Sequence, residues 1–226
     1  MTIVLWDIDG TLIRSGGAGK TAMESALRSA FGLREINDTV PYSGRTDVAI
    51  VRDLLLAHEL PTTEDNQLRL CEAYLRELPG CLKSAGGEIL PGIPNLVESF
   101  HRHDNVLQGL LTGNVRRGAK TKLEHFALWD FFGPGGFGDR QSDRNEVARE
   151  ALQAVESHLG REANRAEIWV IGDTPHDVTC ARAIGANVLA VATGWHPIAE
   201  LEACRADHVL HDLRDTERVR ELLRIG

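Results

Sequence analysis

The sequence contains no long apolar run and no closely spaced pair of cysteines. No stretch approaches the roughly 18 consecutive apolar residues of a membrane-spanning helix, so no transmembrane segment is predicted. Asp7 interrupts the only apolar run near the start and no basic segment precedes it, so a signal peptide is not expected. The cysteines form no Cys-x-x-Cys pair and have no spacing typical of zinc sites. They are expected to be free thiols in a reducing, cytoplasmic setting: Cys71, Cys81, Cys180 and Cys204.

Positive charge is also scarce. The 226 residues carry 25 Lys and Arg against 33 Asp and Glu, a net charge of −8, and no long basic run is present. This balance argues against nucleic acid or an anionic membrane as the main partner. If the substrate is an anion, the protein must create local positive potential with a metal ion, backbone N–H groups and a few placed cations.

The distribution of apolar residues predicts an α/β protein with one insertion. Residues 2–6 form a β-branched, apolar strand, whereas residues 15–85 show apolar positions at helical spacing and no convincing strand. From residue 89 onward, strands and helices alternate, which is typical of a mostly parallel sheet covered on both faces. We therefore expect a core of residues 1–14 and 88–226, with residues 15–87 inserted as a helical unit.

The later strands are expected at four apolar runs, each followed by turn residues. They lie near residues 106–111, 167–172, 187–192 and 208–210, and the intervening helices are expected to start near residues 91, 116, 142, 175 and 197. The glycine-rich segments 84–87 and 133–136 are expected to be loops or hinges.

Polar residues follow several of these strands at the point where each strand ends. Asp7 and Asp9 follow the first strand, Thr112 ends the second, and Asp173 ends the third. Ligands of such sheets bind beyond the carboxyl ends of the strands, so these side chains are expected at one site. Carboxylates at such short distances repel one another unless a cation lies between them. A hard divalent ion such as Mg²⁺ suits a site with only oxygen ligands.

Three motifs in order resemble those of the haloacid dehalogenase superfamily. They are Asp-Ile-Asp-Gly-Thr-Leu over residues 7–12, Leu-Leu-Thr-Gly-Asn over residues 110–114, and Gly-Asp-Thr-Pro-His-Asp over residues 172–177. The likeness spans the whole chain, and the helical insert is similar to the caps of the phosphoglycolate-phosphatase-like branch. The resemblance implies a Rossmann-like parallel sheet core with an inserted α-helical cap.

The resemblance also implies roles for residues at the motif positions. Asp7 would attack phosphorus to form an aspartyl-phosphate, and Asp9 would protonate the leaving group and then activate water. Mg²⁺ would be held by the Asp7 carboxylate, the Asp9 carbonyl and Asp173. The Thr112 hydroxyl would bind phosphoryl oxygens with nearby backbone N–H groups. Supporting positions would be Asp177, Gly113 and Asn114.

The cation that relatives place against the phosphoryl group is open. No lysine follows Lys122, so the Lys-Pro pair that many relatives carry before the last acidic motif is missing. The candidates are Lys122, which is preferred, Lys120 and Arg144. Lys120 and Lys122 lie about 200° apart on a helix, so only one of the two can face the site.

Three other features surround these motifs. Arg45 resembles the cap-loop arginine that relatives turn toward the substrate, although a surface arginine near a helix start is an equal alternative. The segment Gly-Gly-Ala-Gly-Lys-Thr over residues 16–21 lacks the first glycine of a phosphate-binding loop and is expected to be a hinge. Trp195 follows a strand end and is expected near the rim of the site, without an assigned role.

The function that the resemblance implies is a Mg²⁺-dependent phosphatase of small phosphomonoesters. The second acid, Asp9, argues against dehalogenation, which needs no protonation of the leaving group. A phosphomutase of the β-phosphoglucomutase type uses the same two acids and is the alternative, followed by a non-catalytic binding or regulatory relative. The sequence leaves the oligomeric state and the identity of the phosphomonoester open.

Overall fold

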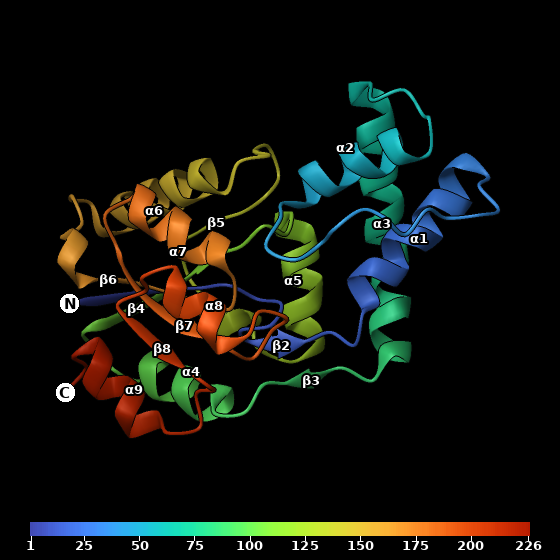
Figure 1. Ribbon diagram of the computed structural model, residues 1–226. Helices are drawn as coiled ribbons and strands as arrows, with labels where there is room; N and C mark the ends of the chain where they lie inside the picture. Colours follow the sequence, from blue (N-terminus) through green and yellow to red (C-terminus); the bar gives the residue numbers. More distant parts are fainter.

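The chain is described by a computed structural model of residues 1–226, whose centre is a six-stranded parallel sheet (Figure 1). The strand order is β5-β4-β1-β6-β7-β8, so β1 lies between the two halves of the sheet. The chain therefore leaves β1 toward one edge and later returns to the other side of β1. The strands are β1 (Thr2–Trp6), β4 (Val106–Leu111), β5 (Gly135–Gly136), β6 (Ile168–Gly172), β7 (Asn187–Val191) and β8 (His208–Leu210).

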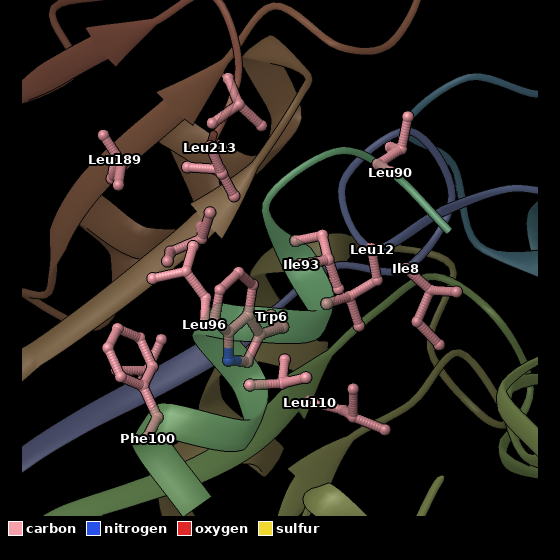
Figure 2. Close-up of a cluster of buried hydrophobic side chains, with 14 of the residues drawn as sticks. Trp6, Ile8, Leu12, Leu90, Ile93, Leu96, Phe100, Leu110, Leu189 and Leu213 are labelled. Carbon is pink, nitrogen blue, oxygen red and sulfur yellow. The ribbon is translucent and has the colours of Figure 1, made fainter. Parts of the chain in front are cut away.

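Helices cover both faces of the sheet because alternate residues of its strands point to opposite sides. Val4 and Trp6 pack with α4 (Ile93–His101), α5 (Arg116–His125) and α9 (Thr216–Leu223). Figure 2 shows Trp6 surrounded by apolar side chains of this cluster, including those of α4. Ile3 and Leu5 pack on the other face, against α6 (Arg144–Leu159), α7 (Pro175–Ala183) and α8 (Ile198–Ala203).

A unit of three helices lies to one side of this sheet (Figure 1). It consists of α1 (Ala18–Phe31), α2 (Asp47–Ala57) and α3 (Glu64–Ala85), which share an apolar cluster of their own. The side chains of Thr46 and Thr63 cap α2 and α3. The two connections to the core run side by side, since β2 (Ile13–Arg14) pairs antiparallel with β3 (Glu88–Ile89).

The expected strands and helices occur within about two residues of their expected bounds, but two expected loops differ. Ser84 and Ala85, in the expected loop 84–87, are the last residues of α3. The second difference is at residues 133–136. This segment was expected to be a loop, but Gly135 and Gly136 form the edge strand β5 beside β4. A Cβ atom on Gly136 would overlap the backbone of Val147 in α6. Because α6 packs so close to this strand, only glycine fits at Gly136, although glycine is generally disfavoured in strands.

Two short 3₁₀ helices complete the fold, η1 (Trp129–Phe131) and η2 (Arg165–Glu167). All four cysteines are free thiols. None of the helices combines the length and the apolar character needed to cross a membrane.

Candidate active site

The candidate site lies at the carboxyl ends of β1, β4 and β6, where the chain reverses its direction across the sheet. Asp7 follows β1, Thr112 follows β4 and Asp173 follows β6, and all three side chains are buried. The strands are adjacent and parallel, so their ends bring these residues together. Open α/β sheets bind their ligands at such a switch point.

Three carboxyl groups form a compact cluster at this edge. Oxygens of Asp7, Asp173 and Asp177 all lie within 4.8 Å of one another, and each residue is buried. Asp177 is placed by a capping box at the start of α7, in which its Oδ2 accepts from the Thr174 N–H at 3.0 Å and from the Thr174 hydroxyl at 2.7 Å. The cap therefore directs Asp177 toward the strand ends.

Burial and repulsion make two members of this cluster, Asp7 and Asp173, hard to ionise. The pKa of Asp7 is raised to about 7, chiefly by burial; the Arg144 guanidinium opposes this rise, and the charges of Asp177 and Asp9 contribute to it. Burial and the charges of Asp177 and Asp7 likewise hold the pKa of Asp173 well above its usual value. An additional cation would relieve this repulsion.

Arg144, the first residue of α6, is the cation that the structure places in the cluster. Its buried guanidinium pairs with Asp177, and Nη2 lies 3.8 Å from Oδ1 of Asp7. Desolvation disfavours its charge, but the pairing with Asp177 and Asp7 more than compensates and raises the pKa of Arg144. One guanidinium balances only one of the three carboxylates.

The surroundings of Asp173 fit a small hard cation. The Thr11 hydroxyl donates to Oδ1 of Asp173 at 3.1 Å, and the Thr193 hydroxyl donates to the Gly10 carbonyl at 2.5 Å. A Cβ atom on Gly10 or Gly194 would overlap the Asp173 carboxylate. Backbone thus closes around an all-oxygen donor set that carries excess negative charge, the combination that suits Mg²⁺.

A second polar group surrounds Asp9. Lys122 Nζ donates to Oδ2 of Asp9 at 2.5 Å and to Oδ1 of Asn114 at 2.6 Å, and the Asn114 amide donates to Oδ2 of Asp9 at 3.0 Å. Desolvation would raise the pKa of Asp9, but the charge of Lys122 and the hydrogen bonds from Lys122, Asn114 and Ser15 outweigh it and lower the pKa. Asp9 is thus an ionised carboxylate when the cavity holds no anion.

Of the three candidate cations, the structure places two at the site. Lys122 and Arg144 are buried and line the cavity described below, one beside Asp9 and the other beside Asp7. Lys120 is exposed, and its ammonium lies 3.6 Å from Glu124 on the same helix. The helical spacing explains this, since Lys120 and Lys122 point to different sides of α5.

The loop after β4 connects the site to the helical unit. The Thr112 hydroxyl accepts from the Asn114 amide at 2.9 Å. The Gly113 carbonyl accepts from the Asp47 N–H at 2.7 Å, and Oδ2 of Asp47 accepts from the Val115 N–H at 2.8 Å. Asp47 is the first residue of α2. Its contact with Val115 depends on tertiary packing that no local pattern reveals.

Asp7, Asp9, Thr112, Lys122 and Asp173 line a cavity of about 740 Å³ between the sheet edge and the helical unit. Arg45 lies in its wall, but its guanidinium is paired with Asp53 at 2.5 Å and donates to the Pro41 carbonyl at 3.1 Å. Trp195 also lines the cavity and is almost fully exposed.

Comparisons with known proteins identify related sequences and a related fold. A phosphoglycolate phosphatase of Synechococcus elongatus is 27% identical over 99% of this chain and 100% of its own length, and that of Rhodospirillum rubrum is 26% identical over 88% and 84%. The crystal structure of CbbY from Rhodobacter sphaeroides in complex with phosphate superposes with a TM-score of 0.76 at 15% identity, covering 95% and 96% of the two chains. The sequence profile of the haloacid dehalogenase-like hydrolases matches residues 4–182, and this chain therefore belongs to that family.

Proposed function

We propose that the protein is a Mg²⁺-dependent phosphatase of small phosphomonoesters that works through an aspartyl-phosphate on Asp7. One observation carries the proposal: two carboxyl groups two residues apart, Asp7 and Asp9, line the same cavity in opposite electrostatic settings. Asp7 lies in the acidic cluster, and Asp9 is bound to Lys122. A nucleophile has to be ionised and a general acid has to carry a proton, so catalysis requires a cation beside Asp7 and a weaker pairing of Asp9 with Lys122 than when the cavity holds no anion.

In the first step, an Asp7 carboxylate oxygen attacks phosphorus and the bond from phosphorus to the ester oxygen breaks. Asp9 takes up a proton from solvent as the substrate binds and gives it to the departing oxygen, so the alcohol leaves uncharged. Lys122 holds the pKa of Asp9 low while the cavity holds no anion. A bound phosphoryl group would attract the ammonium of Lys122 away from Asp9, and the weaker pairing would raise the pKa of Asp9 toward that of a useful acid.

In the second step, Asp9 takes a proton from a water molecule, whose oxygen attacks the phosphorus of the aspartyl-phosphate. The acyl–phosphate bond breaks, and phosphate leaves while Asp7 is regenerated. The Thr112 hydroxyl and Lys122 would hold the phosphoryl oxygens through both steps. Gly113 and Asn114 support this arrangement, because Asn114 bonds Thr112, Asp9 and Lys122 together.

Mg²⁺ would be held by the carboxylates of Asp7 and Asp173 and the carbonyl of Asp9, with Asp177 supporting the cluster. When bound, it would neutralise charge on the carboxylates and on the phosphoryl oxygens and so favour attack by an anion. The raised pKa values of Asp7 and Asp173 support this assignment, because they express a need for positive charge.

The helical unit of residues 15–87 would act as a cap over the substrate, with residues 1–14 and 88–226 as the catalytic core. Closure would exclude water from the phosphoryl group, and Arg45 would lie on the substrate side of the cap. A small molecule, rather than nucleic acid or a membrane, is the proposed partner, in keeping with a net charge of −8. The four free thiols support a cytoplasmic location.

The test is phosphate release from a panel of phosphomonoesters, with and without Mg²⁺. Asp7→Asn is the inactive variant, and Asp104→Asn, which alters an exposed residue before β4, is the matched control. We expect metal-dependent release that is lost in Asp7→Asn and retained in Asp104→Asn. Release that survives in purified Asp7→Asn would refute Asp7 as the nucleophile.

A further inference from the structure

Every cationic side chain in the cavity wall already has an acidic partner. A substrate with a negatively charged leaving group, such as a carboxylate, would have to compete with a protein carboxylate for any of them. An uncharged leaving group disturbs none of these pairs. The pairs are Arg14 with Glu88, Lys20 with Asp38, Arg45 with Asp53, Lys122 with Asp9, and Arg144 with Asp177.

The helical unit contributes an apolar wall to the same cavity. Met23, Val40, Ile50 and Tyr74 line it and also belong to the apolar cluster of the three helices. Their burial fixes them in place, so the wall is part of the fold rather than a set of mobile surface side chains. A leaving group that faces this wall gains from carrying apolar surface.

Trp195 stands out at the rim of the cavity. It is 91% exposed, the highest exposure among the large apolar side chains that reach the surface. Its neighbour Gly194 approaches the Asp173 carboxylate so closely that a Cβ atom there would overlap it. Consecutive Cα atoms are 3.8 Å apart, so Trp195 starts within roughly 7 Å of that carboxylate. The indole is therefore within reach of a leaving group of modest size.

A contact between the cap and the core brings a second aromatic residue to the same rim. The Ser43 hydroxyl lies 3.3 Å from Nε2 of His196, which joins the turn before α2 to the loop after β7. Tyr42 and Trp195 are the chain neighbours of these two residues, and both line the cavity. The rim thus has one aromatic side chain from each part of the molecule, Tyr42 and Trp195, and a flat group can stack on such a side chain.

We propose that the leaving group of the substrate is an uncharged planar ring, aryl or heterocyclic, that stacks on Trp195. The inference rests on the proposed phosphatase function and names the class of its substrate. It also sets this cavity apart from one built for a two-carbon acid, since 740 Å³ lies in the range of sites for larger ligands.

The test compares two esters that differ in the planarity of the ring, benzyl phosphate and cyclohexylmethyl phosphate, with 2-phosphoglycolate as the anionic alternative. Both ring esters release a primary alcohol, so their intrinsic reactivities are similar. We expect kcat/KM to be highest for benzyl phosphate and to fall about tenfold for it in Trp195→Ala, with most of the activity retained in Trp195→Phe. The loss for cyclohexylmethyl phosphate should be about threefold or less, and Leu68→Ala, which alters an exposed side chain of α3, should change nothing.

An equal fall in kcat/KM for all three substrates in Trp195→Ala would overturn the proposal. A native enzyme whose kcat/KM is higher for 2-phosphoglycolate than for benzyl phosphate would overturn it as well. Calorimetric titration with benzylphosphonate, which cannot be hydrolysed, separates this inference from the proposed function. Tighter binding of benzylphosphonate than of cyclohexylmethylphosphonate, lost in Trp195→Ala, would support the ring site even if no ester were hydrolysed. Identical binding by the native protein and Trp195→Ala would overturn the ring site even if the phosphatase activity were established.

Discussion

Replacing Asp7 with asparagine should stabilise the metal-free protein at pH 8 while it removes the proposed nucleophile. The carboxyl group of Asp7 is buried, and burial raises its pKa from 3.8 to about 7. Between these values the folded state holds a proton that the unfolded state has released, so the stability falls as the pH rises from about 4 to 7. Asparagine has nearly the same shape and does not ionise, so it avoids this cost.

The size of the pKa shift of Asp7 determines the expected gain in stability. One pKa unit corresponds to about 1.4 kcal/mol, so ionised Asp7 costs up to about 4 kcal/mol above pH 7. At pH 5 the folded state keeps the proton, and only about 1.6 kcal/mol of that cost is present. Because the charges of Asp7 and Asp173 affect one another, we expect a gain of about 2–4 kcal/mol for Asp7→Asn at pH 8, and less than half of it at pH 5.

The assay is thermal and urea unfolding in a chelating buffer at both pH values. For a chain of 226 residues, the gain at pH 8 corresponds to a rise in Tm of roughly 5–10 °C. Asp104→Asn, at an exposed position, should leave the Tm unchanged. A Tm of Asp7→Asn equal to or below that of the native protein at pH 8 would refute the view that the acidic cluster is strained by its own charge.

Three further predictions concern the metal, the cation and the glycine beside Asp173. Mg²⁺ should raise the Tm more at pH 8 than at pH 5, because protons compete for Asp7 and Asp173 as the pH falls; equal shifts would argue against binding at these residues. Lys122→Ala should lower kcat by about 10²–10³-fold, whereas Lys120→Ala should change kcat less than about twofold. Steady-state rates in the reverse order would contradict the assignment of Lys122 as the cation at the phosphoryl group. Gly194→Ala should raise the Mg²⁺ concentration for half-maximal activity at least about tenfold, because the added methyl group displaces the Asp173 carboxylate. Gly80→Ala, where the structure has open space, is its control, and an unchanged metal dependence of Gly194→Ala would count against Asp173 as a ligand.

Much of the fold follows from the sequence because the strands are short apolar runs with clear ends. The runs that end at Asp7, Thr112 and Asp173 are buried on both faces, which leaves little ambiguity about strand positions. The strand at Gly135 and Gly136 could not be predicted, because two consecutive glycines normally indicate a loop. The glycines are needed here because α6 packs very close to the strand, and this contact is not visible in the sequence.

Site residues that directly follow a strand could be predicted from the sequence. Contacts that depend on how the helices pack could not. The proximity of Lys122 to Asp9 follows from the short return of α5 toward the sheet. The pairing of Arg144 with Asp177 and the bond from Val115 to Asp47 depend on how α6 and α2 pack beside the strand ends, and no local pattern specifies such partners.

The central claim is the covalent intermediate on Asp7, and the most direct measurement is acid quenching of the native enzyme during turnover, followed by mass spectrometry of its peptides. The account predicts a peptide that contains Asp7 and carries one phosphoryl group, which hydroxylamine removes and which Asp7→Asn never forms. Full phosphate release with no phosphorylated peptide, or a phosphoryl group on another residue, would contradict it.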